Sequence, residues 1–219
     1  MQDAGRRNAL LALLSAPAGL AACATSEAPP MTGQHERRED MLADMRARLD
    51  RIESRFEIAD TLCKYARACD RADEALMRGC FWPESTLKHG RFDGASMDFV
   101  AFSFRIINSL KFAAHHISNI SVEVRGDHGF SECHYFAHHR RDAQNGGGEE
   151  DVFFEGRYID LHERRSGVWK IIRRRGLSDF TSRAAPANTP FADWPADQRS
   201  GRAPNDDYYA MRQAFLAGS

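Results

Sequence analysis

Residues 111–124, KFAAHHISNISVEV, mark the point where the spacing of apolar residues along the chain changes. Before this stretch, apolar residues recur every three or four positions, which is typical of a helix that buries one face. From Ile120 onward, apolar and polar residues alternate, which indicates a strand with one buried face. The sequence therefore predicts a helical first half and a β-rich second half.

Extended segments separated by turns dominate the second half. The expected strands are residues 120–125, 130–141, 152–163 and 168–174, and a short additional strand is expected at 86–91. Glycine-containing turns separate the four longer segments, at residues 126–129, 145–148 and 166–167. Short turns favour antiparallel neighbours, so these segments are expected to form an antiparallel meander.

One long helix, or two nearly collinear ones, is expected over residues 41–70, followed by short helices at 74–81 and 97–110. The apolar residues of the long helix follow steps of four and three and are expected to face the core: Met45, Leu49, Ile52, Phe56, Ala59, Cys63 and Ala66. The same series ends on the carboxylate of Asp70. Helices followed by a meander make an α+β layout, in which a curved sheet wraps around the long helix.

The composition indicates one soluble domain. The chain has 219 residues, of which 42% are hydrophobic and 28% charged, which is enough for a core and an enclosed pocket. The formal net charge is −1, and basic residues are interspersed with acidic ones. No basic patch predicts binding to nucleic acid or to an anionic membrane surface.

The first 22 residues look like an export signal. A pair of arginines, Arg6 and Arg7, precedes an apolar run that ends in the sequence LAAC at Cys23, which is typical of a twin-arginine signal with a lipobox. The run contains Pro17 and is shorter than the roughly 20 residues of a spanning helix. We therefore expect lipidation of Cys23 and a lipoprotein facing the periplasm. An ordinary secretory peptide and a misassigned start codon are the alternatives.

The remaining chain is expected to have three parts. Residues 23–40 are expected to be a flexible tether, residues 41–183 the folded domain, and residues 184–219 a C-terminal extension with a short helix at 208–216. Four cysteines besides Cys23 are expected to be mostly small buried residues: Cys63, Cys69, Cys80 and Cys133. Six residues of helix separate the first two by about 9 Å, which prevents a disulfide between them. In an exported protein, a disulfide that involves Cys80 or Cys133 is the alternative.

Several short motifs, in this order and spacing, resemble the SnoaL-like branch of the nuclear transport factor two-like superfamily. They are ADTLCKY at 59–65 leading to Asp70, FWPE at 81–84, the His-x-x-x-Asn of His115 to Asn119, and RY at 157–158 with GVWK at 167–170. The resemblance covers roughly residues 41–182. It implies a cone-shaped α+β barrel, with N-terminal helices packed in a curved antiparallel sheet and an apolar pocket behind the open mouth.

Within that superfamily the chain resembles scytalone dehydratase, bile-acid dehydratase and hexachlorocyclohexane dehydrochlorinase, which remove water or HCl from hydrophobic rings without a cofactor. The resemblance implies a catalytic pair of Asp70 and His115, with no metal. It also implies that Tyr65 and Arg174 bind substrate. His89 stands where the dehydratases have a second pocket tyrosine, so the part of the arrangement that holds water differs here.

An aspartate–histidine pair suits elimination, because imidazole is a base near neutral pH and a carboxylate fixes its tautomer. Strand alternation, however, places His116 rather than His115 on the apolar face, and we include both as candidates. A β-bulge between His115 and Asn119 would reconcile the two patterns. Asp70 is equally suited to cap the short helix that follows, and Tyr65 to pack in the core.

Two clusters of basic residues are expected to be mostly solvated. Residues 138–141, HHRR, have the character of a strand end beside the glycine loop, from which one histidine can reach the pocket. Residues 173–175, three arginines, are expected at a sheet edge with a single inward member.

The expected function is that of a cofactor-free lyase or isomerase, dehydratase-like or dehydrohalogenase-like, that acts on a hydrophobic cyclic small molecule. The alternative is a non-catalytic, lipid-anchored binding module for an apolar ligand or partner. The expected partners are a small hydrophobic ligand and further copies of the chain in a homotrimer or homodimer. No nucleic acid is expected, and the membrane is expected only through the lipid anchor.

Overall fold

The computed structural model describes residues 31–186 and 189–218 and is a mixed α+β structure. Its helices are α1 (Met31–Asp70), α2 (Glu74–Gly79), α3 (Ser96–Ile107) and α4 (Asp207–Leu216), with two short 3₁₀ helices before α4. Its strands are β1 (Phe81–His89), β2 (Phe92–Ala95), β3 (Phe112–Arg125), β4 (His128–Asp142), β5 (Glu149–Arg165) and β6 (Val168–Pro186). The chain divides into two compact units, residues 1–43 and 44–219, and the whole sheet lies in the second.

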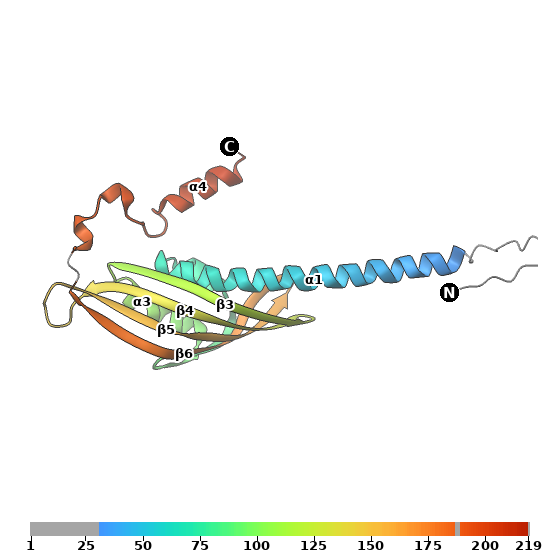
Figure 1. Cartoon of the computed structure of the whole chain (residues 1–219), viewed down its shortest axis with the longest axis horizontal. Helices are drawn as coiled ribbons and strands as arrows, with labels where there is room; N and C mark the ends of the chain where they lie inside the picture. The colour runs from blue at the N-terminus through green and yellow to red at the C-terminus, as the bar shows by residue number, and fades with distance from the viewer. Residues whose placement is uncertain (1–30, 187–188, 219) are drawn as a thin grey trace, which may run out of the picture. The chain divides into compact units, whose positions relative to one another are not determined.

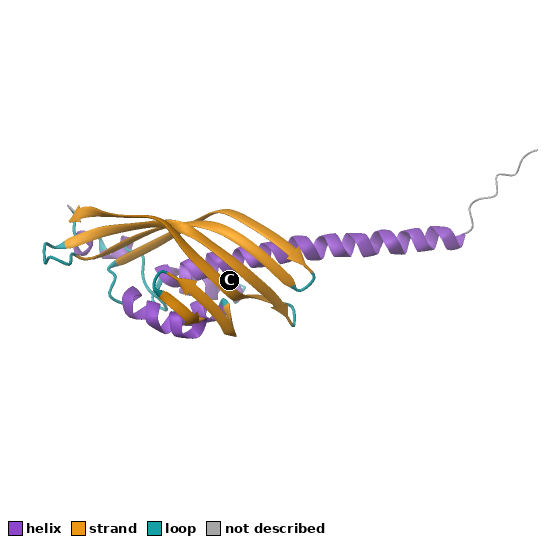
Figure 2. Ribbon diagram, turned by 90° about the horizontal axis from the view of Figure 1, so that it is seen from below, coloured by secondary structure: helices purple, strands orange, loops and turns teal. Residues whose placement is uncertain are grey.

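A single six-stranded sheet has the order β2-β1-β6-β5-β4-β3. The four long strands β3 to β6 form the predicted antiparallel meander and lie side by side in Figure 1. Strands β3, β4 and β5 begin earlier than predicted, whereas β6 begins at Val168 as predicted. Strands β1 and β2 form a hairpin, and β1 runs parallel to β6. Figure 2 shows how the strands twist across the helices, so the sheet curves around them.

Helix α1 packs its inward face on the sheet. Ile58 is fully buried against Val122 and Trp169. The contact requires a glycine on the facing strand, because a Cβ atom at Gly129 would lie 2.6 Å from the Ile58 Cδ1 atom. Further along, Leu62 joins the main core cluster between α1, α2, α3 and the sheet. The inward face therefore includes Ser54, Ile58, Thr61, Leu62 and Tyr65, all buried.

The predicted core-facing series of α1 is wrong in its first half. Met45, Leu49, Ile52 and Phe56 are 55%, 53%, 53% and 73% exposed. The buried positions Ser54, Ile58, Thr61 and Leu62 lie on the opposite side of the helix. Hydrophobic periodicity indicates that a helix has an apolar face, but it does not say which neighbour covers that face. Here the sheet covers the less apolar side.

Two further expectations for the N-terminal half are corrected. Helix α1 begins at Met31, directly after Pro30, so the part of the expected tether from residue 31 to residue 40 is helical. Good helix formers and an ion pair at helical spacing, His35 with Glu39 at 3.1 Å, explain this. Cys63 is exposed, whereas Cys69, Cys80 and Cys133 are buried and free. The expected export signal and Cys23 lie outside the described residues.

The C-terminal extension is attached to the folded domain by a segment that we call the clasp, residues 201–209. The clasp backbone donates from the Ala203 amide to the Arg71 carbonyl at 2.7 Å. The guanidinium of Arg202 donates to the Leu110 carbonyl, and the Tyr209 hydroxyl donates to Asp73 at 2.7 Å. The clasp therefore covers the corner where α1 ends and the loop after α3 begins.

No helix within the described ranges is long and apolar enough to cross a membrane.

Candidate functional site

The end of α1 presents the carboxylate of Asp70. The helix stops here because Ala72 adopts a left-handed conformation, with φ of 49°. Asp73, not Asp70, caps α2, since its Oδ1 atom accepts from the Leu76 amide at 2.9 Å. The capping role that the sequence allows for Asp70 therefore belongs to Asp73, and Asp70 is available to another partner.

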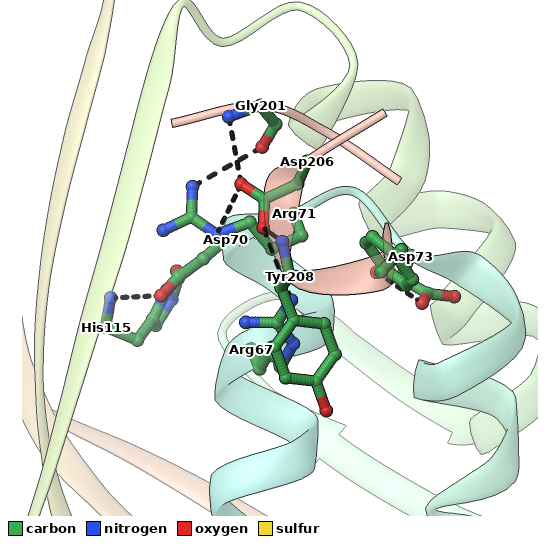
Figure 3. A network of polar contacts seen from close by, with 9 residues as sticks. Arg67, Asp70, Arg71, Asp73, His115, Gly201, Asp206 and Tyr208 are labelled. Carbon is green, nitrogen blue, oxygen red and sulfur yellow. Dashed lines mark hydrogen bonds and ion pairs between the residues drawn. The ribbon is translucent and has the colours of Figure 1, made fainter. Parts of the chain in front are cut away.

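That partner is His115 of β3. The Asp70 Oδ1 atom lies 2.6 Å from the His115 Nδ1 atom, and Oδ2 accepts from the His115 backbone amide at 3.0 Å. Both side chains are largely buried, 13% and 9% exposed. Figure 3 shows Asp70 turned toward His115, whereas its helical neighbours Arg67 and Arg71 turn toward Asp206 of the clasp. A carboxylate that holds Nδ1 and the backbone fixes the orientation of the ring and leaves Nε2 as its basic nitrogen.

The choice between His115 and His116 is decided by a bulge. The register of β3 against β4 shifts between Ser118 and Ser121, and Asn119 has a φ of 50°. Before the shift the inward positions include Ala113 and His115, and after it Val122 is inward. His116 is exposed, and its ring lies 6.2 Å from that of Phe136. The structure therefore places His116 away from Asp70, which plain alternation could not have indicated.

Two more imidazoles lie on the interior side of the sheet. The His139 ring of β4 is 5.3 Å from the His115 ring, and its Nε2 atom is buried without a hydrogen-bond partner. Burial, and next the neighbouring His115, lower the pKa of His139 to about 3. His89 of β1 packs against Phe99, and burial lowers its pKa to about 4. Both rings are thus neutral at neutral pH and able to donate or accept a hydrogen bond.

The space for the His89 ring is made by a second glycine. A Cβ atom at Gly176 of the adjacent β6 would lie 1.9 Å from His89 Nδ1. That Nδ1 atom is buried without a partner. His89 was predicted as a site residue, and it lies in the interior, with its ring 5.7 Å from that of Tyr158.

Arg174 and Tyr65 belong to a buried polar cluster. The Arg174 guanidinium makes two hydrogen bonds to Asp160, at 2.8 and 2.6 Å, and neither side chain is exposed. It lies between the rings of Tyr65 and Tyr158, 4.1 and 4.2 Å from their centroids. Burial raises the pKa of the Tyr65 hydroxyl far above its usual value. Arg174 is the single inward arginine of 173–175, as predicted, but the predicted sheet edge is wrong, because β6 lies between β1 and β5. The charge of Arg174 is neutralised by Asp160.

The cavity beside the Asp70–His115 pair is small. It has a volume of about 20 Å³ and is lined by Asp70, Lys111 and Ala113 together with clasp residues Gly201 and Arg202. A cavity of this size holds about one water molecule. A larger hollow of about 720 Å³ is lined by Phe130, Leu161 and Arg173, on the outer side of the sheet, and does not include the pair. With the clasp in place, the pair is closed to a ring-sized molecule from this side.

Sequence reasoning missed Asp160 as an interior residue and did not say which histidine of residues 138–141 is inward, which is His139. The signal for His139 was present, because Cys133, Tyr135, Ala137 and His139 alternate along β4 and all four face inward. The charged residues that follow it favoured a solvated strand end instead. Asp160 gave a weaker signal, since only its pairing with Arg174 across β5 and β6 explains a buried carboxylate.

A comparison with protein families matches the SnoaL-like domain to residues 50–175, which is more than half of the chain. A comparison with curated proteins returns no match. The matched range contains Asp70 and His115, strands β1 to β5 and the first part of β6, but it leaves out the clasp.

Solved structures with the same fold include two hexachlorocyclohexane dehydrochlorinases and a putative scytalone dehydratase. The LinA-type3 dehydrochlorinase from Novosphingobium barchaimii LL02 is 20% identical, with a TM-score of 0.54, over 64% of this chain and 97% of that one. The LinA Type2 dehydrochlorinase is 19% identical, with a TM-score of 0.55, over 68% and 97%. The putative scytalone dehydratase from Novosphingobium aromaticivorans is 19% identical, with a TM-score of 0.51, over 72% and 99%. At these identities the similarity shows a shared fold alone.

Proposed function

Because this chain belongs to the SnoaL-like domain family, we propose that it is a cofactor-free lyase or isomerase acting on a hydrophobic cyclic small molecule. The observation that carries the proposal is the 2.6 Å contact between Asp70 Oδ1 and His115 Nδ1. The names of the solved neighbours, dehydrochlorinases and a putative scytalone dehydratase, support elimination as the reaction class.

In the proposed elimination, the Nε2 atom of His115 takes a proton from a ring carbon. The electron pair of that C–H bond forms the new double bond, and the leaving group departs from the neighbouring carbon. It leaves as halide, or as water when the departing hydroxyl receives the proton from the His115 imidazolium. Asp70 stabilises the imidazolium that forms. In an isomerisation, the same nitrogen returns the proton to another carbon. General base catalysis of this kind contributes about 100- to 10,000-fold.

Neutral imidazoles suit the second role, which is to stabilise charge on the substrate. His139 is adjacent to His115, and its free Nε2 atom faces no protein partner. A neutral donor inside a water-poor site stabilises a developing negative charge more strongly than it would in water. His89 is the other candidate donor, whereas Tyr65 and Arg174 support the pocket through their packing around Asp160.

The proposal is tested with a panel of cyclic hydroxyketones and halogenated rings, with loss of substrate followed by mass spectrometry. His115→Ala is expected to reduce kcat/KM by at least 100-fold on any substrate that the wild type converts. The adjacent His116→Ala is the matched control, since it removes an equally sized but exposed ring, and it should retain activity. Equal turnover by wild type and His115→Ala would overturn the role of the pair.

A second candidate function is that of a binding module, and the small size of the cavity beside Asp70 favours it. On this proposal the interior is filled, and the protein binds an apolar ligand or partner on its surface without converting it. Ligand binding by the panel compounds, detected by thermal shift, with no product from any of them, is the result that favours binding. Conversion of even one compound by the wild type, lost in His115→Ala, favours the lyase.

We also propose export and lipid anchoring through Cys23, on the sequence pattern of residues 6–23. Metabolic labelling with a radioactive fatty acid is expected to label the full chain and to fail for Cys23→Ala. Labelling of both, or of neither, would contradict a lipid on this cysteine.

A further inference from the structure

The outward face of α1 carries an apolar stripe that nothing in its own chain covers among the described residues. Met45, Leu49, Ile52 and Phe56 are each more than half exposed. They are spaced by four, three and four residues, which is the a/d spacing of a coiled coil. Toward the C-terminus the same spacing continues to Ala59 and the exposed Cys63. In heptad notation Leu49 and Phe56 occupy a positions, and Met45 and Ile52 occupy d positions.

The stripe is not needed for the fold of a single chain. The opposite side of the same helix already packs on the sheet, through Ile58 and Leu62. The apolar surface continues onto the sheet, since a groove of about 370 Å³ lies between Ile52, Phe56 and the β3 residue Ile120, itself 38% exposed. A contiguous exposed apolar surface of this kind marks an interaction site.

The charged residues beside the stripe indicate which partner covers it. The g positions are Arg48 and Arg55, and the e positions are Glu53 and Asp60. All four are exposed. In a parallel pair of helices each g residue faces the e residue of the next heptad of the partner, so Arg48 would face Glu53 and Arg55 would face Asp60. The stripe is therefore complementary to a second copy of itself.

An antiparallel pair of the same helices is disfavoured by the same charges. Antiparallel pairing brings g positions opposite g positions and e positions opposite e positions. When Ile52 of one helix packs against Phe56 of the other, Arg55 comes close to Arg55 and Glu53 close to Glu53. Like charges at this distance repel, so the parallel arrangement is selected.

We propose that two copies of this chain associate through α1 as a parallel two-stranded coiled coil, with Met45, Leu49, Ile52 and Phe56 in the seam. The same patch on both subunits forms the contact, as a two-fold axis requires. The seam is short, about 17 Å from Met45 to Phe56 at helical rise, so the association is expected to depend on protein concentration.

The first test is sedimentation equilibrium of the full chain in a mild non-ionic detergent. A dimer of the 24.7 kDa chain is expected at high concentration. Leu49→Glu with Phe56→Glu is expected to give only monomer, with unchanged circular dichroism. The matched control is Phe130→Glu with Leu161→Glu, which changes two residues of similar exposure on the sheet and should remain dimeric. Monomer at every wild-type concentration, or a dimer that persists in the α1 variant, would overturn the proposal.

The second test determines whether the two α1 helices are parallel or antiparallel. Leu49→Cys, in a chain that also carries Cys23→Ser and Cys63→Ser, is expected to form a disulfide-linked dimer on mild oxidation, because a positions meet their own copies only in a parallel pair. Arg51→Cys, exposed on another side of the helix, is the control and should not cross-link. Linkage of both or of neither variant would contradict the parallel seam.

A charge exchange separates self-pairing from a general apolar contact. Arg48→Glu with Arg55→Glu is expected to weaken the dimer at least tenfold, because glutamates then face Glu53 and Asp60. Adding Glu53→Arg and Asp60→Arg to the same chain is expected to restore it. An unchanged dimerisation constant in the first variant would exclude the proposed pairing.

Discussion

The less apolar face of α1 is buried against the sheet, whereas its more apolar face is exposed. The inward face buries two hydroxyl residues, Ser54 and Thr61, at 1% and 6% exposure, beside Ile58 and Leu62. The outward face exposes four large apolar residues in an unbroken series. Burial is tolerated on the inward side because the hydroxyls are bonded: Thr61 donates to the Glu57 carbonyl at 2.9 Å, and Ser54 accepts from Arg164 at 3.3 Å.

This difference indicates that two partners, the sheet and a second chain, determine the residues on the two faces of one helix. The sheet selects the inward face through fit, as the requirement for glycine at position 129 shows. The outward face keeps its apolar residues although the sheet does not need them, and we assign them to a second chain. Asp70 continues the spacing of the outward series in steps of three and four, so the proposed chemistry is not on the side that packs through Ile58 and Leu62.

The largest effect is expected at Asp70. Asp70→Asn keeps the shape of the side chain but removes the charge that stabilises a protonated His115, so kcat/KM should fall by about 100- to 10,000-fold. The measurement is steady-state kinetics on the best substrate of the panel. Asp73→Asn, a neighbouring carboxylate that caps α2, is the control and should stay within a few-fold of wild type. Full activity of Asp70→Asn would place the chemistry elsewhere.

A direct comparison of the two faces uses one leucine from each. Leu62→Ala is expected to lower the free energy of unfolding by about 2–5 kcal/mol, because it opens a cavity in the core. Leu49→Ala should change it by less than about 0.5 kcal/mol in the monomer, because the side chain is already exposed. Urea unfolding at a concentration where the chain is monomeric measures both. Similar losses in the two variants would show that the outward stripe is covered within one chain.

The fit of the inward face is probed at Gly129. Gly129→Ala should cost about 1–3 kcal/mol, because the new methyl group meets the Ile58 Cδ1 atom and either α1 or β4 has to shift. Gly79→Ala is the control, since a Cβ atom there meets nothing within 4 Å. Thermal unfolding compares the two, and equal melting temperatures would mean that α1 is packed more loosely than described.

A dependence of stability on pH is also expected. Burial lowers the pKa values of His89 and His162 to about 4 and that of His139 to about 3. In the unfolded chain they titrate near 6.5. The unfolded state therefore binds more protons below pH 6.5, so stability is full above that pH and falls as the pH is lowered toward 4. Each histidine contributes a slope of about 1.4 kcal/mol per pH unit.

His139→Gln isolates one of these contributions. The slope of unfolding free energy against pH, measured between pH 5 and 6, should become shallower by about 1.4 kcal/mol per pH unit. His134→Gln, which changes an exposed histidine of the same strand, is the matched control. An unaltered slope in His139→Gln would mean that its ring is hydrated in solution.

The fold was largely readable from local patterns. The turns at 145–148 and 166–167 connect strands β4 to β5 and β5 to β6 as the sequence predicts, because such turns are decided by a few adjacent residues. The parallel pairing of β1 with β6 was not readable, since it joins residues more than 80 positions apart. The inward face of α1 was predicted wrongly for the same reason, because the facing surface is formed by distant strands.

The candidate site, too, could be predicted from the sequence only in part. The meeting of Asp70 and His115 was expected only through the family resemblance, and periodicity alone favoured His116. The bulge that turns His115 inward depends on Asn119 adopting a left-handed backbone, which asparagine tolerates better than most residues but does not require. Neither the clasp nor the buried pair of Arg174 with Asp160 has a local signal, since each joins segments far apart in the sequence.

The clasp holds the end of α1 through two ion pairs that lie on either side of Asp70. Asp206 binds Arg67 and Arg71, which lie three residues before and one residue after Asp70 on α1. Residues far apart in the sequence therefore hold the end of α1 that carries Asp70. Assays of the proposed activity thus require a chain that retains residues 201–209.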